Sequence, residues 1–129
     1  MTITQLIYTS QPFGFDDAML NGILVQARRN NPAQDITGCL ICRQDMYLQL
    51  LEGPGDAIDT LYAKIKADDR HLAVMQLSRE TVSARMFPDW AMRDDPAQSW
   101  LWPPEAVASG ALFQASPDAL RAVFARVAI

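Results

Sequence analysis

Several features that mark other protein classes are missing or scarce in this sequence of 129 residues. No apolar run approaches the roughly 18 residues that a membrane-spanning helix needs. Lysine and arginine are absent before Arg28, so the N-terminus lacks the positively charged start of a signal peptide. The formal net charge of −4 and the pI of about 4.7 disfavour nucleic acid and anionic membrane surfaces as partners. We therefore expect a cytoplasmic protein with no nucleic-acid partner and no membrane partner.

Metal-ligating and redox-active residues are also few. The chain has one histidine, His71, and two cysteines, Cys39 and Cys42, which form a C-x-x-C motif. The motif lies in a predicted strand, where side chains three positions apart point to opposite faces. A metal site there would lack a second pair of ligands. We expect no metal site and interpret both residues as free core cysteines, with a functional dithiol as the alternative.

What the sequence does contain is a hairpin at residues 36–53, where two apolar runs flank a polar break at residues 43–45. A two-residue turn at positions 44 and 45 would place Cys42 opposite Tyr47 and Leu40 opposite Gln49. Alternation then puts Gln49 on an otherwise apolar face. An unpaired buried amide costs roughly 1–3 kcal/mol. Gln49 must therefore bond to a backbone group or point at something bound.

The remaining pattern predicts alternating strands and helices in a single domain. We expect strands at residues 3–9, 71–82 and 89–93, and helices at residues 17–29 and from about 55 to 67–69. Asn31 precedes a proline, which predicts an extended residue after the first helix. Glu52 is expected to cap the second helix or to pair near it.

The predicted order, β-α-β-β-α-β with a short extra strand, favours an α+β fold of the ferredoxin-like sandwich type. Two helices would cover one face of a mixed sheet, with right-handed crossovers and parallel central strands. The other face needs a cover too. The tail offers two short helices, one from Pro103 to about Gly110 and one after Ser116. Trp100 and Trp102 would pack where the tail returns to the sheet, or form a partner surface.

Seven short motifs occur in an order and spacing that resemble a known family. They are LIYTS at residues 6–10, ARRNN at 27–31, ITG at 36–38, YLQLLEGP at 47–54, DDRH at 68–71, R-x-FPDW at 85–90, and Met92. Together they resemble the BLUF family, flavin-binding sensors of blue light. The resemblance covers residues 1 to about 93. It implies the ferredoxin-like fold, with the flavin inserted between the two helices.

The resemblance implies a photoactive set. Tyr8 matches the tyrosine that donates an electron to the excited flavin, and Gln49 matches the glutamine between that tyrosine and the flavin. Trp90 and Met92 match residues of the last strand whose arrangement is thought to change with signalling. Taken without the resemblance, Tyr8 would be interpreted as an ordinary core tyrosine.

The resemblance also implies a set of cofactor-binding residues. Ile23 and Leu40 match apolar positions that line the ring, Asn31 matches the asparagine that binds the pyrimidine edge, and Asn30 lies where the family varies. Polar positions at the end of the second helix are matched by Lys64, Asp68, Arg70 and His71. Lys64 occupies a position that is often arginine, and it cannot give the same planar bidentate contact.

Side-chain chemistry agrees with such a slot. Ile23, Ala27 and Ile65 can supply apolar walls and Leu40 a floor. The amides of Asn31 and Gln49 each offer a donor and an acceptor, so rotation or tautomerisation of Gln49 would exchange what it presents. The structural alternative for Asn31 is a cap on the helix before Pro32.

We therefore expect a stand-alone short blue-light receptor that binds FAD noncovalently, for which FMN or riboflavin could substitute, and that turns over no substrate. Residues 1–95 would form the flavin-binding domain and residues 96–129 a helical extension packed on it. Output would pass through an unidentified downstream protein or through altered self-association, and we expect a homo-oligomer. The alternatives are a small flavoprotein reductase or acylphosphatase-like enzyme, and a ligand-free interaction module. Against an enzyme, the sequence shows no phosphate-binding Gly-rich loop and no nucleophile–base pair.

Overall fold

The protein is described from a computed structural model. Residues 2–12, 17–43, 45–68, 71–88, 93–96 and 101–128 are described.

The described strands form one five-stranded sheet in the order β4-β1-β3-β2-β5. Their bounds are β1 Ile3–Pro12, β2 Thr37–Arg43, β3 Met46–Gly53, β4 His71–Val82 and β5 Arg93–Pro96. β1 pairs antiparallel with β3 and β4, β2 pairs antiparallel with β3, and β5 runs parallel to β2. The mixed sheet is confirmed. Parallel central strands were the wrong expectation, because β3 lies between β1 and β2 and separates the two strands that α1 connects.

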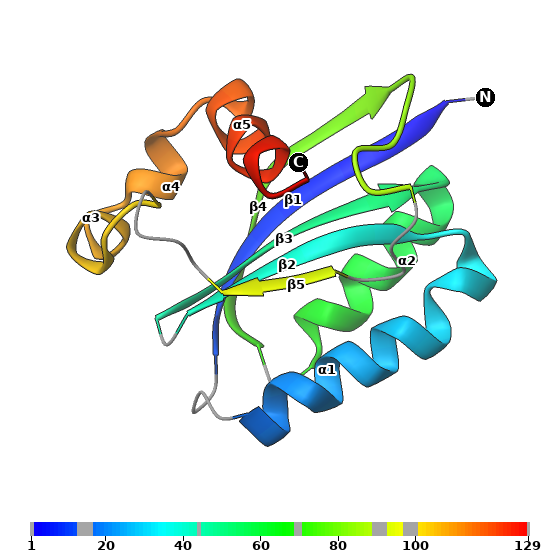
Figure 1. Cartoon of the computed structure of the whole chain (residues 1–129), viewed down its shortest axis with the longest axis horizontal. Coiled ribbons are helices and arrows are strands. Elements are labelled where there is room, and N and C mark those ends of the chain that lie inside the picture. Colours follow the sequence, from blue (N-terminus) through cyan, green and yellow to red (C-terminus); the bar gives the residue numbers. More distant parts are fainter. Residues whose placement is uncertain are drawn as a thin grey trace.

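Helices cover both faces of this sheet (Figure 1). α1, Asp17–Asn30, and α2, Gly55–Lys66, lie on one face, and the short helix η1, Pro32–Gln34, follows α1. α5, Pro117–Ala128, lies on the other face, preceded by α3, Pro104–Ala108, and α4, Ala111–Gln114. The ferredoxin-like sandwich is therefore confirmed, with tail helices on the second face. α4 was not expected.

Each face of the sheet has its own core. The core under α1 and α2 contains Leu6, Tyr8, Ile23, Leu24, Ile36, Leu40, Cys42, Tyr47, Leu51 and Ile58. The core under α5 contains Ile7, Cys39, Ile41, Met46, Leu48, Leu50, Phe87, Leu101 and Leu112, together with Leu120, Val123, Phe124 and Val127 of α5. The two cysteines thus lie on opposite faces, as alternation predicted, and neither forms a disulfide.

The hairpin register is confirmed, with Leu40 paired to Gln49 and Cys42 to Tyr47. The predicted last strand lies mostly outside the described part of the chain. Of the predicted range 89–93, only Arg93 lies in β5, and the other four residues are outside the described part of the chain.

The prediction for Asn31 was wrong. Its φ of −64° and ψ of −41° are helical rather than extended. Its backbone N–H donates to the carbonyl of Ala27 at 2.8 Å, which continues α1 by one hydrogen bond despite the following proline. The backbone bond outweighs the local preference.

Candidate functional site

A cavity of about 930 Å³ lies between the sheet and the two helices on its first face. β1 and β3 contribute the polar pair Tyr8 and Gln49, α1 and the turn after it form one wall, and α2 forms the other. The wall residues from α1 and the turn are Ile23, Gln26, Ala27, Arg29, Asn30, Asn31, Ala33, Gln34, Asp35 and Ile36. The opposite wall comprises Pro54, Asp56, Ala57, Thr60, Leu61, Lys64, Ile65 and Asp68.

Tyr8 and Gln49 are directly opposed on adjacent strands, β1 and β3. The Tyr8 hydroxyl donates a hydrogen bond to Oε1 of Gln49. Both side chains are buried, with exposures of 0% and 4%. The sequence left open whether the Gln49 amide bonds to a backbone group or points at something bound. In the structure it accepts a hydrogen bond from the phenol of Tyr8, beside the cavity. Leu40, which pairs with Gln49 from β2, is fully buried in the core that contains Tyr8 and is not among the residues that line the cavity.

The phenol of Tyr8 is held in its protonated form. Burial raises its pKa far above the usual value, and the neighbouring Tyr62, Asp68 and Tyr47 raise it further. The rings of Tyr8 and Tyr62 lie 5.6 Å apart between centroids, tilted by 53°. Tyr8 therefore remains a hydrogen-bond donor to Gln49 across the neutral pH range.

Asn31 lies at the junction of α1 and η1 with 3% of its surface exposed. The backbone makes this turn, because the Asn31 carbonyl accepts from the N–H groups of Gln34 and Ile36 at 3.0 and 2.9 Å. The Asn31 side chain makes no capping hydrogen bond to η1. Asn31 also lines the cavity, as the flavin-binding interpretation requires, and a cap on α1 stays the structural alternative.

The structure brings most of the sequence-predicted residues together. Besides Tyr8, Gln49 and Asn31, the cavity is lined by Ile23, Ala27, Asn30, Lys64, Ile65 and Asp68. Trp90, Met92 and Arg70 lie outside the described residues. His71 is the first residue of β4, where it pairs with Pro12, and its side chain is outside the description.

Sequence reasoning missed the polar row on α2. Asp56 and Thr60 line the cavity together with Lys64, each four positions apart, so they lie on one face of the helix. The signal was available, since spacings of four residues mark one helical face. Arg29 and Asp35 line the cavity from the other wall, which makes its lining mixed in charge.

The donor set fits a flat heterocycle with a polar edge. Ile23, Ala27, Leu61 and Ile65 offer apolar surface on both helical walls, while amides and a phenol supply directed hydrogen bonds. The cavity volume lies within the range of small-molecule sites, roughly 300–1,000 Å³. Within the described residues, no cluster of histidine, cysteine and acidic side chains could hold a metal ion. None of the described helices combines the length and apolar character that a membrane crossing needs.

Comparison with known proteins points to one family. The family model for BLUF, sensors of blue-light using FAD, matches residues 3–93. The chain is 37% identical over 95 residues to photoactivated adenylate cyclase subunit beta of Euglena gracilis, covering 70% of this chain and 11% of that protein. It is 36% identical over 61 residues to the blue light- and temperature-regulated antirepressor BluF of Escherichia coli (strain K12), covering 47% of this chain and 15% of that protein. The chain thus spans a small part of the length of these relatives.

Solved structures agree with the fold. BlrB, a BLUF protein in its dark state, has a TM-score of 0.77 at 28% identity and covers 98% of this chain and 95% of its own. BlsA in its photo-activated state has a TM-score of 0.84 over 100% of this chain and 96% of its own; at 23% identity, it supports the fold alone. Klebsiella pneumoniae BlrP1 with FMN and cyclic diGMP has a TM-score of 0.68 at 32% identity, over 73% of this chain and 26% of its own.

Proposed function

This chain belongs to the BLUF family of blue-light sensors that use a flavin, and we propose that it binds FAD noncovalently in the cavity and responds to light through Tyr8 and Gln49. The observation that carries the proposal is the hydrogen bond from the Tyr8 hydroxyl to Oε1 of Gln49 beside the cavity. A bound flavin supplies the absorption of blue light and a one-electron acceptor, and its absorption maximum responds to the donors at its carbonyl edge.

Tyr8 has the properties of a proton-coupled electron donor. Its phenol is buried and protonated, and its proton already faces an acceptor, Oε1 of Gln49. Loss of an electron makes a phenol strongly acidic, so the proton can move to the amide oxygen without crossing solvent. Return of the electron and proton restores Tyr8, while Gln49 can settle with its amide rotated or tautomerised.

Gln49 is proposed as the switch because its two ends differ. In the described state its carbonyl oxygen faces Tyr8. An amide carries a double donor at one end and an acceptor at the other, so exchanging them reverses what it presents to the cavity. A carboxylate would not serve in the same way because it has no donor, and a hydroxyl carries its donor and acceptor on one atom, so it has no two ends to exchange.

The binding residues are proposed from the lining of the cavity. The Asn31 amide would bind an edge that pairs an N–H with a carbonyl, and Asn30 lies beside it. Ile23, Ala27 and Ile65 would contact the faces of the ring, with Leu40 paired to Gln49 in the sheet. Lys64 would face a tail phosphate as a point charge, whereas an arginine would form a fork, and Asp68 stands on the same wall. Arg70, His71, Trp90 and Met92 are proposed on the resemblance alone.

The output is proposed to pass to another protein or to a change in self-association, with no substrate turned over by this chain. Residues 1–95 would sense light, and residues 96–129 would form an extension packed on the same domain. The relatives named above include an adenylate cyclase subunit and an antirepressor. We propose a cytoplasmic location, and no observation favours the reductase or hydrolase alternatives.

The test begins with the colour of the purified protein. It should be yellow, should release mainly FAD on denaturation, and should show a reversible red shift of the flavin bands under blue light. Tyr8→Phe is the matched variant, because it removes only the hydroxyl that contacts Gln49, and it should stay yellow without the shift. A protein that remains colourless with added FAD, or that bleaches to stable reduced flavin with no shifted form, would overturn the proposal.

A further inference from the structure

The chain that follows β4 contacts the β2–β3 hairpin in the order of the β2 sequence. Arg85 binds Thr37 at the start of β2. β5 then pairs with residues 39–42. Trp102 is bound by Arg43, the last residue of β2. The described parts of residues 85–102 therefore lie along the hairpin from its open end to its turn.

The open end is fixed by Glu52, which is the partner of Thr37 and fully buried. Its carboxylate accepts from the backbone N–H groups of Met86 and Phe87, each at 2.8 Å, and from Nε2 of Gln5 at 3.1 Å. This placement corrects the expectation that Glu52 serves the second helix. It secures the connection after β4, on the sheet face opposite the cavity.

Arg85 strengthens the same attachment. Its guanidinium donates to the hydroxyl of Thr37 at 2.9 Å, to the carbonyl of Glu52 at 3.0 Å and to the carbonyl of Asp35 at 2.7 Å. It also forms an ion pair with the Asp35 carboxylate at 3.0 Å. Asp35 ends η1 and lines the cavity, so this anchor reaches from the cavity rim to the chain after β4.

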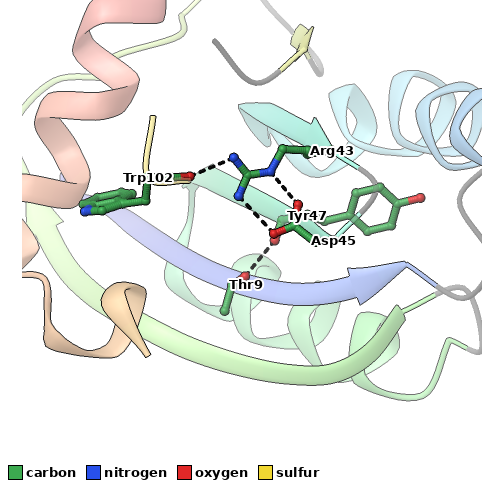
Figure 2. A network of polar contacts seen from close by, with 5 residues as sticks. All are labelled: Thr9, Arg43, Asp45, Tyr47 and Trp102. Carbon is green, nitrogen blue, oxygen red and sulfur yellow. Dashed lines mark hydrogen bonds and ion pairs between the residues drawn. The ribbon is translucent and has the colours of Figure 1, made fainter. Parts of the chain in front are cut away.

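The turn end is fixed by Arg43 (Figure 2). Its guanidinium contacts both carboxylate oxygens of Asp45, one of them at 3.0 Å, and donates to the backbone carbonyl of Trp102 at 2.7 Å. Nearby, the Thr9 hydroxyl donates to the carbonyl of Tyr47 at 2.9 Å and so ties β1 to the same end of β3. Because Arg43 binds backbone, it holds the chain itself just before α3 begins at Pro104.

We propose that Arg43 is a positioning residue that couples the β2–β3 hairpin to α3 and α4, so that a change at Gln49 reaches these helices from the turn of the hairpin. The proposal rests on the proposed function of Gln49. Gln49 lies in β3, every residue of which is buried, and is paired on both sides with β1 and β2. A close-packed strand of this kind transmits a displacement to its neighbours instead of absorbing it. The planar guanidinium then passes it to the carbonyl of Trp102.

A competing route exists at the opposite edge of the sheet. Arg121 of α5 pairs with Glu80 of β4 at 2.8 Å and also contacts Asp118 on its own helix. Glu80 lies in the edge strand β4, whereas Arg43 lies in β2, next to the opposite edge strand β5, so the two attachments are on different sides of the sheet. Each is a part-buried arginine, with side-chain exposures of 21% and 31%. Arg121→Gln is therefore a matched control for Arg43→Gln.

The experiment is amide hydrogen exchange, in the dark and under blue light, on the full-length flavin-loaded protein, followed by mass spectrometry. The wild type should show a light-dependent change in the exchange rates of peptides spanning residues 101–116. In Arg43→Gln, the light and dark exchange rates of these peptides should become equal, a ratio of about 1, while the red shift of the flavin persists. Arg121→Gln should retain the wild-type ratio.

The outcomes separate this inference from the proposed function. A wild-type protein with no red shift would refute the proposed function. A red shift with no light-dependent exchange at residues 101–116 overturns only the coupling, and so does an Arg43→Gln protein that keeps the wild-type ratio. If Arg43→Gln does not fold, Asp45→Asn replaces it, since it removes the charge that orients the guanidinium while leaving Arg43 in place. Asp45→Asn should then also give a ratio of about 1 for residues 101–116. A wild-type ratio in Asp45→Asn would refute the coupling.

Discussion

The two faces of the sheet are made by the same strands but are organised differently. In β3, Leu48 and Leu50 point into the core under α5, whereas Gln49 points to the face under α1 and α2. The α5 core is a continuous apolar cluster in which Phe124 is fully buried. The other face contains an open cavity and the hydrogen-bonded pair of Tyr8 and Gln49.

This division separates stability from chemistry. Close apolar packing stabilises a fold but leaves no space for a ligand, whereas a cavity with buried polar groups offers a site and forgoes part of that packing. Placing each property on its own face lets one strand serve both. Substitutions on the α5 face should therefore change the free energy of unfolding, and those on the cavity face should change the light response.

The largest effect on stability is expected from Phe124→Ala. Removing a fully buried phenylalanine should lower the free energy of unfolding by about 3–5 kcal/mol, measured by urea denaturation. Phe113→Ala is the control, because Phe113 is 57% exposed on α4 and its loss should cost less than about 0.5 kcal/mol. Under native conditions, folded Phe124→Ala should still show the red shift. Equal costs for the two variants would refute the α5 core as the main apolar support of this face.

Because burial raises the pKa of Tyr8, the free energy of unfolding should depend on pH through this residue of the cavity face. Its folded pKa lies above the unfolded value of about 10. Its contribution is therefore fully present below pH 10 and is lost as the pH rises toward the folded pKa. The stability difference between wild type and Tyr8→Phe should decline above pH 10 by up to about 1.4 kcal/mol per pH unit. Parallel stability curves for the two proteins up to pH 11 would contradict the burial of this phenol.

Asn31→Ala should weaken flavin binding while sparing the fold. Loss of one hydrogen bond, worth about 0.5–1.5 kcal/mol, corresponds to a roughly two- to twelvefold rise in Kd, measured by titrating apoprotein with FAD. The melting temperature of the apoprotein should change little, because backbone groups make the turn at Asn31. Asn30→Ala, at the exposed neighbouring position, should weaken binding less. A large loss of apoprotein stability would return Asn31 to a structural role.

The sequence predicted the strand register better than the cavity. Alternation and a short turn sufficed to pair Leu40 with Gln49, because a period of two residues leaves little freedom in a hairpin. The short helix expected after Ser116 is likewise present, as α5. The backbone of Asn31 was mispredicted because hydrogen bonds to Ala27, Gln34 and Ile36 decide it, and those depend on the folded turn.

Other features depended on tertiary contacts that no local pattern reveals. β5, with the sequence RDDP, has no alternating apolar pattern, and its pairing with β2 defines it. The insertion of β3 between β1 and β2 is likewise set by the sheet as a whole. The attachment of Glu52 to Met86 and Phe87 joins residues more than 30 positions apart.

The smallest effect on the light response is expected from replacing both cysteines. Cys39 lies in the α5 core and Cys42 in the core beside the cavity, so the two thiols are separated by the sheet. The double variant Cys39→Ala, Cys42→Ala should keep the light-minus-dark spectrum of the wild type. Loss of the red shift in a folded, flavin-loaded double variant would revive the dithiol hypothesis.

The light-minus-dark absorption spectrum of flavin-loaded Gln49→Leu tests the central claim most directly. Leucine is close in size to glutamine and suits this apolar face, so the fold and the bound flavin should be retained. It has neither a donor nor an acceptor to exchange, and Tyr8 loses the acceptor of its proton. We predict a yellow, folded protein with no red shift under blue light. A normal red shift in that protein would remove Gln49 from the mechanism and leave it a structural partner of Tyr8.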